Sequence, residues 1–335
     1  MFKFIFLLFF FNSTLANEVN VFTSRHYDSD IKLYKKFTQE TGIKVNILSG
    51  KGKMLEKRII EEGENCIADV YIASDAGILG SAQSKNIFKA INSDILNENV
   101  PIIYRSDYWY GITKRARIIF YSPERVKESE LKNLKYEDLS KKEWNKRIAV
   151  RQSNNVYNQS LVASLIHNIG QDETKLWLKG FVKNFSKSPQ GNDRAQILSV
   201  ASGEADIAIA NTYYYGLMLS GQKGEEQKKA ALKVKGFFPN QNGRGAHMNI
   251  SGAGVLTNSP NTSNAIKFIE FLTSKVAQQH IINNTFEYPI VHGVEPSDFI
   301  LKLGERFVED TKTRVKTFFI NQSLALSLMT KAGWK

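Results

Sequence analysis

Cysteine and histidine are scarce in this 335-residue chain, and their scarcity excludes several kinds of site. The single cysteine, Cys66, can form neither an internal disulfide nor a multi-cysteine metal site, so we expect a packed thiol. Only five histidines occur, and the motifs H-E-x-x-H, G-x-S-x-G, Walker A and C-x-x-C are all absent. The sequence therefore lacks the signatures of several common enzyme classes.

Long apolar runs are also missing. The run over residues 4–11 follows Lys3 and precedes Thr14-Leu15-Ala16, which supplies small residues at the cleavage positions. A bilayer-spanning helix needs about 20 apolar residues, whereas this pattern is typical of a secretory signal peptide. We therefore expect residues 1–16 to be removed and a secreted protein to begin near Asn17.

The charge of the chain is basic but scattered. Forty-five Lys and Arg residues oppose 33 Asp and Glu residues, which leaves a net charge of +12. The basic residues do not form an arginine stripe interleaved with aromatic side chains, as a nucleic-acid surface would. We therefore interpret the charge as solvated surface and expect no nucleic-acid partner.

Alternating strand and helix patterns predict an α/β protein, and the length predicts about two domains. A strand around Val19 and Val21 precedes a helix that Gly42 ends, and a buried strand follows at 68–73. Ser74 and Asp75 then follow as cap residues before another helix. Two β-prone runs, 108–113 and 118–121, with basic residues between them, would carry the chain into a second lobe. That lobe repeats the alternation, with a loop that holds Tyr157 before a helix at 160–169, a helix capped by Gly191-Asn192-Asp193, and a strand at 205–210. We therefore expect two lobes around a cleft.

Four tyrosines follow the ends of predicted strands, and we call Tyr27, Tyr157, Tyr213 and Tyr214 the tyrosine cluster. In parallel α/β lobes such positions meet at the carboxyl edge of the sheet, where ligands bind. A phenol has a reference pKa near 10, so it becomes an anionic ligand only beside a strong electrophile such as a trivalent hard cation. The alternative interpretation is an aromatic cluster that caps the sheet.

A ferric ion bound by four phenolates would carry a net charge of −1, which requires a positive partner when buried. Arg115 and Arg117 lie on the basic segment between the lobes and are candidates for that partner. His26 precedes Tyr27, and its role stays open between a nitrogen ligand, a donor behind the ligands and an ordinary surface residue.

The chain resembles the periplasmic ferric-iron-binding proteins of ABC iron transporters, particularly the Fut-type members. The resemblance covers essentially the whole mature chain. Its motifs are Val21-Phe22-Thr23-Ser24-Arg25-His26-Tyr27, Val150-Arg151-Gln152-Ser153, Tyr157-Asn158-Gln159-Ser160, Gly191-Asn192-Asp193-Arg194, Asn211-Thr212-Tyr213-Tyr214, Gly243-Arg244-Gly245 and Asn249-Ile250-Ser251-Gly252.

This resemblance implies a two-lobe, transferrin-like type II periplasmic-binding-protein fold, with mixed sheets flanked by helices and hinge strands between the lobes. One lobe would comprise residues 17–114 and 244–293, and the other residues 115–243 and 294–335. The family further implies a monomeric carrier, not an enzyme, that has no organic cofactor and delivers iron to an inner-membrane ABC permease from the periplasm.

The resemblance also implies which residues hold iron. The ligands would be Tyr27, Tyr157, Tyr213 and Tyr214, with Arg117 as a charge partner behind them. Some relatives use the histidine of the His-Tyr pair as a fifth ligand, so His26 remains open. Tyr215 falls outside the family's pattern and is assigned to packing.

Three alternatives remain at this stage. An oxyanion or organic solute would use Asn192, Ser153 and helix amino termini as donors. A non-haem iron enzyme usually needs two histidines and one carboxylate, which the sequence does not offer as an obvious set. Ferrous iron is a further candidate ligand beside Fe(III), because the positive side chains tolerate its lower charge.

Overall fold

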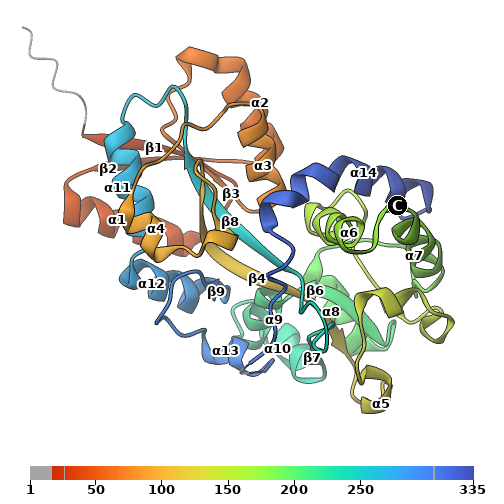
Figure 1. Cartoon of the computed structure of the whole chain (residues 1–335). Coiled ribbons are helices and arrows are strands. Elements are labelled where there is room, and N and C mark those ends of the chain that lie inside the picture. The colour runs from red at the N-terminus through yellow and green to blue at the C-terminus, as the bar shows by residue number, and fades with distance from the viewer. Residues whose placement is uncertain (1–16, 26, 305) are drawn as a thin grey trace, which may run out of the picture.

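One mixed sheet organises the chain, and its strands run in the order β2-β1-β3-β8-β4-β6-β5 (Figure 1). The computed structural model describes residues 17–25, 27–304 and 306–335, so the predicted signal peptide and His26 lie outside the described residues. The strands are β1 Glu18–Thr23, β2 Lys44–Ser49, β3 Val70–Ala73, β4 Tyr110–Tyr121, β5 Ile148–Ala149, β6 Ile207–Asn211, β7 Lys235–Phe237, β8 Met248–Val255 and β9 Tyr288–Pro289.

Helices flank both ends of this sheet (Figure 1). They are α1 Asp28–Thr41, α2 Gly52–Glu62, α3 Ala76–Ser84, α4 Asp94–Asn99, α5 Glu128–Leu131, α6 Val156–Ile169, α7 Gln171–Lys183, α8 Asp193–Ser202, α9 Thr212–Leu219, α10 Glu225–Leu232, α11 Thr262–Leu272, α12 Lys275–Thr285, α13 Asp298–Leu301 and α14 Phe318–Lys331. Within the described chain, no helix combines the length and apolarity that a bilayer span requires.

The strand directions confirm part of the predicted alternation. Strand β1 is parallel to both β2 and β3, and β5 is parallel to β6. Strand β8 is antiparallel to β3 and β4, and β4 is antiparallel to β6. The sheet is therefore mixed, because β8 returns late in the chain to lie between two strands formed much earlier.

Strand β4 connects the two halves of the molecule. Its first part, up to Ala116, pairs with β8, and its last part, from Arg117, pairs with β6. Both predicted β-prone runs contribute to this one strand, and the basic residues between them continue it. They do so because Arg115 and Arg117 find buried polar partners, while Lys114 reaches Glu309 at 2.6 Å.

Several predicted helix ends are confirmed by the backbone. Gly42 ends α1 with a φ of 72°, a left-handed value that glycine adopts readily. The Asp75 carboxylate accepts a hydrogen bond from the Gly77 N–H at 2.7 Å at the start of α3, and Asn192 caps α8. Cys66 is a buried free thiol, as predicted.

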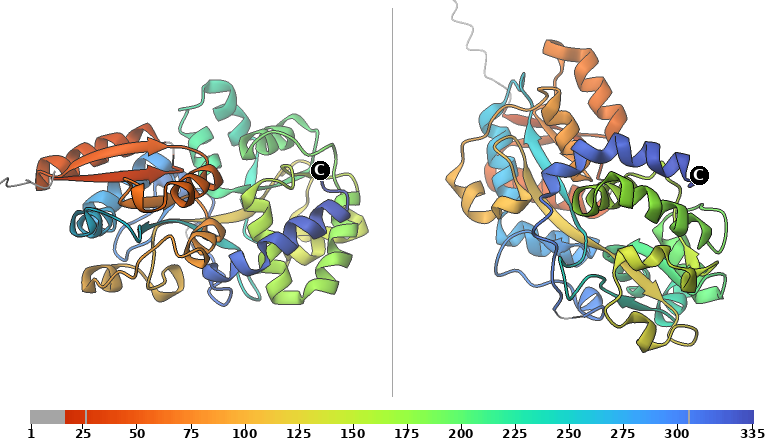
Figure 2. Two further views of the ribbon diagram at one scale, coloured as in Figure 1. Left: turned by 90° about the horizontal axis from the view of Figure 1, so that it is seen from above. Right: turned by 45° about the vertical axis from the view of Figure 1, so that its right-hand side comes forward.

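Helix α14 packs against both α3 and α6, and so connects the two halves on one side of the sheet (Figure 2). It closely approaches α3 at Gly80, where an added Cβ would lie 2.6 Å from the Cβ of Phe319. Beyond α14, Trp334 packs edge-on against Phe181 in an apolar cluster with α6 and α7. The carboxyl-terminal segment is therefore part of the folded core.

Candidate metal centre

Tyr27 occupies the N-cap position of α1, directly after the loop that leaves β1. Its backbone is extended, with φ −97° and ψ 124°. The Arg25 Cζ atom lies 4.8 Å from the centroid of the Tyr27 ring. Burial raises the pKa of the Tyr27 phenol well above its usual value, and Glu287 raises it further, whereas Arg25 lowers it. Without a cation, this phenol is therefore protonated at neutral pH.

Tyr157 lies in the first turn of α6. The side chain of Asn155 caps this helix by accepting a hydrogen bond from the Tyr157 N–H at 3.2 Å. The sequence predicted that the helix begins at Ser160 and that Tyr157 belongs to a loop, and both predictions are wrong. The reason is the Asn155 cap, which starts the helix at Val156 and orients the tyrosine from a rigid element.

Tyr213 and Tyr214 also lie in a first helical turn, because β6 leads directly into α9. Their ring centroids are 4.2 Å apart, and the Tyr213 hydroxyl donates a hydrogen bond to the Tyr157 hydroxyl at 3.4 Å. Tyr215 instead stacks on Phe120 with a centroid distance of 5.5 Å. Of the three consecutive tyrosines 213–215, the first two thus lie in the cluster, whereas Tyr215 packs in the core as predicted.

The four phenols of the tyrosine cluster lie close enough to influence one another electrostatically. Burial raises the pKa of Tyr213, and the phenols of Tyr157, Tyr214 and Tyr27 raise it further. Burial and the Tyr157 phenol likewise raise the pKa of Tyr214. The structure thus brings together all four tyrosines that the sequence singled out, from helices α1, α6 and α9.

Arg117, the predicted charge partner, ties two of these helices together. It is 1% exposed, and its Nη1 atom donates to Asp193 Oδ2 at 3.0 Å and to Asn211 Oδ1 at 2.9 Å. Its Nη2 atom donates to Asn158 Oδ1 at 2.6 Å. Because Asn158 follows Tyr157 and Asn211 is the N-cap residue of α9, Arg117 reaches the cluster through the starts of α6 and α9.

Arginines other than Arg117 lie directly against the phenols. The Cζ atoms of Arg115 and Arg151 lie 5.3 Å and 5.8 Å from the centroid of the Tyr157 ring. Arg25 occupies the equivalent place beside Tyr27. From the sequence, Arg115 and Arg117 were both candidates for the charge partner, whereas Arg25 and Arg151 were not singled out for this role. Arg115 and Arg117 are two positions apart in β4, so both side chains lie on the same face of the strand.

The donor atoms around the cluster fit an anionic metal complex. Among the described residues, Arg25 Nη2, Arg115 Nε and Arg151 Nε are buried without a hydrogen-bond partner. Within the same residues, no group of three or more His, Cys, Asp or Glu side chains is placed to hold a metal ion. Four phenol oxygens surrounded by guanidinium groups suit a hard trivalent cation, which prefers oxygen ligands and ionises them. His26, the open fifth ligand, lies outside the described residues.

Comparisons with known proteins agree on one family. The family described as bacterial extracellular solute-binding protein matches residues 65–302. Iron uptake protein A1 of Synechocystis sp. is 47% identical over 322 residues, which cover 95% of this chain and 88% of that protein. Iron uptake protein A2 of the same organism is 39% identical over 327 residues, which cover 96% and 92% of the two chains.

A solved structure shares the fold along almost the whole chain. The Trichodesmium protein IdiA, or FutA, in complex with iron and citrate ligands, superposes with a TM-score of 0.90 at 46% identity. The match covers 95% of this chain and 100% of that one. The predicted type II periplasmic-binding-protein fold is confirmed by this match. The chain therefore belongs to the family of bacterial extracellular solute-binding proteins.

Proposed function

We propose that the protein captures Fe(III) in the periplasm with the phenolates of the tyrosine cluster and delivers it to an inner-membrane ABC permease. The observation that carries this proposal is the convergence of Tyr27, Tyr157, Tyr213 and Tyr214 beside Arg25 and Arg115, with Tyr213 buried and the other three half-buried. The relatives support it, because their names describe iron uptake and one solved relative holds iron and citrate.

The charges around the cluster support a ferric cargo. Four phenolates and one Fe(III) sum to −1, and a buried charge of this kind needs compensation. Arg25 and Arg115 lie against the rings of Tyr27 and Tyr157, so their positive charge is placed where the phenolates develop. Fe(II) is a secondary cargo in this proposal, because the same guanidiniums tolerate the extra negative charge of a ferrous complex.

The proposed lobes comprise residues 17–114 with 244–293 and residues 115–243 with 294–335. The partner change along β4, between Ala116 and Arg117, supports a boundary in that strand. Lobe closure would exclude water from the phenolates. We further propose that the carrier is a monomer without enzymatic activity, an organic cofactor or a nucleic-acid partner, and that residues 1–16 direct it to the periplasm.

Adding ferric citrate to the iron-free protein tests this proposal. A phenolate-to-iron charge-transfer band should appear in the visible region, with an orange to red colour. Tyr213→Phe removes one phenol and should weaken or shift the band. Tyr215→Phe is the matched control, because its ring stacks on Phe120 outside the cluster. The absence of a band in the wild-type protein, or identical behaviour of both variants, would contradict the proposal.

The alternative from the sequence is an oxyanion or organic solute as the ligand. Asn192 is one of the residues proposed to bind such a solute. In the structure its side-chain oxygen caps α8 by accepting a hydrogen bond from the Ala195 N–H at 3.1 Å. Calorimetric titration with phosphate, sulfate and citrate, compared with ferric citrate, separates the two functions. Binding of an iron-free anion as tight as that of ferric citrate would favour the alternative.

A further inference from the structure

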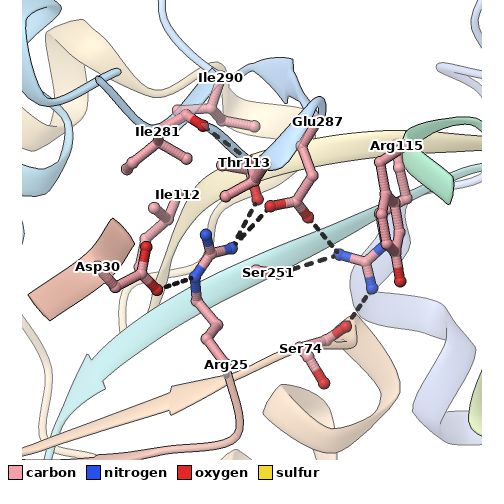
Figure 3. A network of polar contacts seen from close by, with 12 residues as sticks. Arg25, Asp30, Ser74, Ile112, Thr113, Arg115, Ser251, Ile281, Glu287 and Ile290 are labelled. Carbon is pink, nitrogen blue, oxygen red and sulfur yellow. Dashed lines mark hydrogen bonds and ion pairs between the residues drawn. The ribbon is translucent and has the colours of Figure 1, made fainter. Parts of the chain in front are cut away.

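The buried carboxylate of Glu287 lies between the guanidinium groups of Arg25 and Arg115 (Figure 3). The Glu287 Oε2 atom accepts a hydrogen bond from Arg25 Nη1 at 2.9 Å, and its Oε1 atom lies 4.0 Å from Arg115 Nη1. All three side chains are only 2% exposed. Since Arg25 lies against Tyr27 and Arg115 against Tyr157, Glu287 connects both sides of the tyrosine cluster.

Both arginines are held in fixed positions by further contacts. Arg25 donates through Nε to Asp30 Oδ2 at 3.1 Å and through Nη1 to Thr113 Oγ1 at 3.2 Å. Arg115 donates through Nη1 to Ser251 Oγ at 3.2 Å. The guanidiniums therefore cannot easily move to follow a change of charge at the metal, and nearby fixed charges set the potential there.

Two carboxylates near the cluster each face two arginines. Asp193 lies 3.0 Å from Arg117 and 3.2 Å from Arg151, whereas Glu287 faces Arg25 and Arg115. Removing the charge of Glu287 would leave these two arginines with only Asp30 and Asp75 as nearby carboxylates.

We propose that Glu287 is a positioning residue that sets the electrostatic potential of the tyrosine cluster and so biases it toward ferric over ferrous iron. This inference rests on the proposed iron binding. A buried negative charge near a metal stabilises the higher positive charge, so Glu287 favours Fe(III). The guanidiniums act in the opposite direction, and Glu287 limits their effect.

Only one guanidinium separates the Glu287 carboxylate from each of two cluster rings. Arg25, which donates to Glu287 at 2.9 Å, has its Cζ atom 4.8 Å from the centroid of the Tyr27 ring. Arg115, whose Nη1 atom lies 4.0 Å from Glu287, has its Cζ atom 5.3 Å from the centroid of the Tyr157 ring. The carboxylate is thus close enough for its charge to alter the energy of a metal bound by these phenols.

Glu287→Gln tests the inference, because glutamine keeps the shape and one acceptor but removes the charge. The matched control is Glu309→Gln. Glu309 pairs at 2.6 Å with Lys114, which lies between Thr113 and Arg115 but points to the other face of β4. The reduction potential of bound iron is measured in a mediator titration that is monitored through the visible band. Thermal unfolding of the iron-free proteins is measured in parallel.

The expected result is a higher reduction potential for Glu287→Gln, with the ratio of ferrous to ferric binding constants rising about tenfold. Glu309→Gln should keep the wild-type potential, and Glu287→Asp, which retains the charge, should restore most of it. Equal potentials in Glu287→Gln and the wild-type protein would overturn the inference, even if Glu287→Gln unfolds at a lower temperature.

Two further results separate this inference from the proposed function. If the wild-type protein develops no visible band, iron binding fails and the inference fails with it. If all variants develop the band and the potential does not move, only the inference fails. Should Glu287→Gln not fold, Arg25→Gln is the reciprocal test, because losing a positive charge should lower the potential. An unchanged or higher potential in Arg25→Gln would contradict the inference.

Discussion

Each tyrosine of the cluster lies at the amino-terminal end of a helix. Tyr27 is the N-cap residue of α1, Tyr157 is in the first turn of α6, and Tyr213 and Tyr214 are in the first turn of α9. The amino-terminal end of a helix carries a partial positive charge, which favours an anion placed near it. Backbone dipoles would therefore add to the arginines in stabilising the proposed phenolates, whereas burial raises the pKa of Tyr27 and Tyr213 in the iron-free protein.

At the scale of single residues, we predict that iron binding weakens steeply in acid. The raised pKa values of Tyr27 and Tyr213 mean that the iron-free phenols are protonated, so binding must release protons and a lower pH opposes it. Competition with a chelator between about pH 8 and about pH 5 should show this loss. Calorimetry in buffers of different ionisation enthalpy should show one proton fewer released by Tyr213→Phe. An affinity that does not depend on pH would exclude phenolate ligands.

At the scale of elements, helix starts are tied to one another across the sheet. Arg117 joins the starts of α6 and α9 through Asn158 and Asn211. Asp75 caps α3 and also accepts a hydrogen bond from Ser160 on α6, at 3.0 Å. These contacts position the tyrosine helices relative to the sheet, so the cluster depends on caps as well as on its own side chains.

Asp75→Ala should destabilise the protein by about 2–4 kcal/mol. It removes the cap of α3 and leaves the buried donors of Ser160 and Asn249 without their acceptor. Ser274→Ala is the control, since the only side-chain hydrogen bond of Ser274 within the described chain is the one its hydroxyl accepts from the Ala277 N–H to cap α12, so this change should cost only about 1 kcal/mol. Denaturant unfolding of the iron-free proteins measures both. Equal losses would mean that the contact with α6 contributes nothing.

At the scale of the whole molecule, the chain returns to earlier segments to complete its structure. Strand β8 inserts between β3 and β4, and α14 packs against both α3 and α6 (Figures 1 and 2). The proposed lobes are thus joined both through β4 and through α14. Helix α14 contacts α3 closely at Gly80, so a relative motion of the proposed lobes would have to change the packing there.

Gly80→Ala tests this packing. In an open helix the change would stabilise the protein by about 1 kcal/mol, because alanine favours the helix. Here the new Cβ would lie 2.6 Å from the Phe319 Cβ, so we expect a loss of about 1–3 kcal/mol. Gly243→Ala is the control, because its Cβ would meet only the Asn240 carbonyl oxygen at 3.6 Å. Thermal unfolding distinguishes the two, and a more stable Gly80→Ala would refute the close contact.

Local patterns in the sequence were sufficient for much of the fold. Strand and helix periodicity depends on neighbouring residues, so the parallel strands β1 to β3 and the caps at Gly42, Asp75 and Asn192 could be predicted. The partners of β4 could not be predicted, because β6 and β8 come from distant parts of the chain. Buried polar partners, among them Ser251 for Arg115 and Asp193 for Arg117, stabilise these arginines inside the strand.

The candidate site divides in the same way. By itself, the sequence determined its chemistry: with one cysteine, five histidines and tyrosines after strand ends, it pointed to phenol oxygens as the donors. Only the tertiary structure decided which charges surround these oxygens, because the sequence contains many arginines and does not show that Arg25, Arg115 and Arg151 lie beside the tyrosines. Glu287 reaches Arg25 across 262 positions of sequence, and no local pattern specifies such a contact. Packing geometry brings these residues together, whereas periodicity reports only on neighbours along the chain.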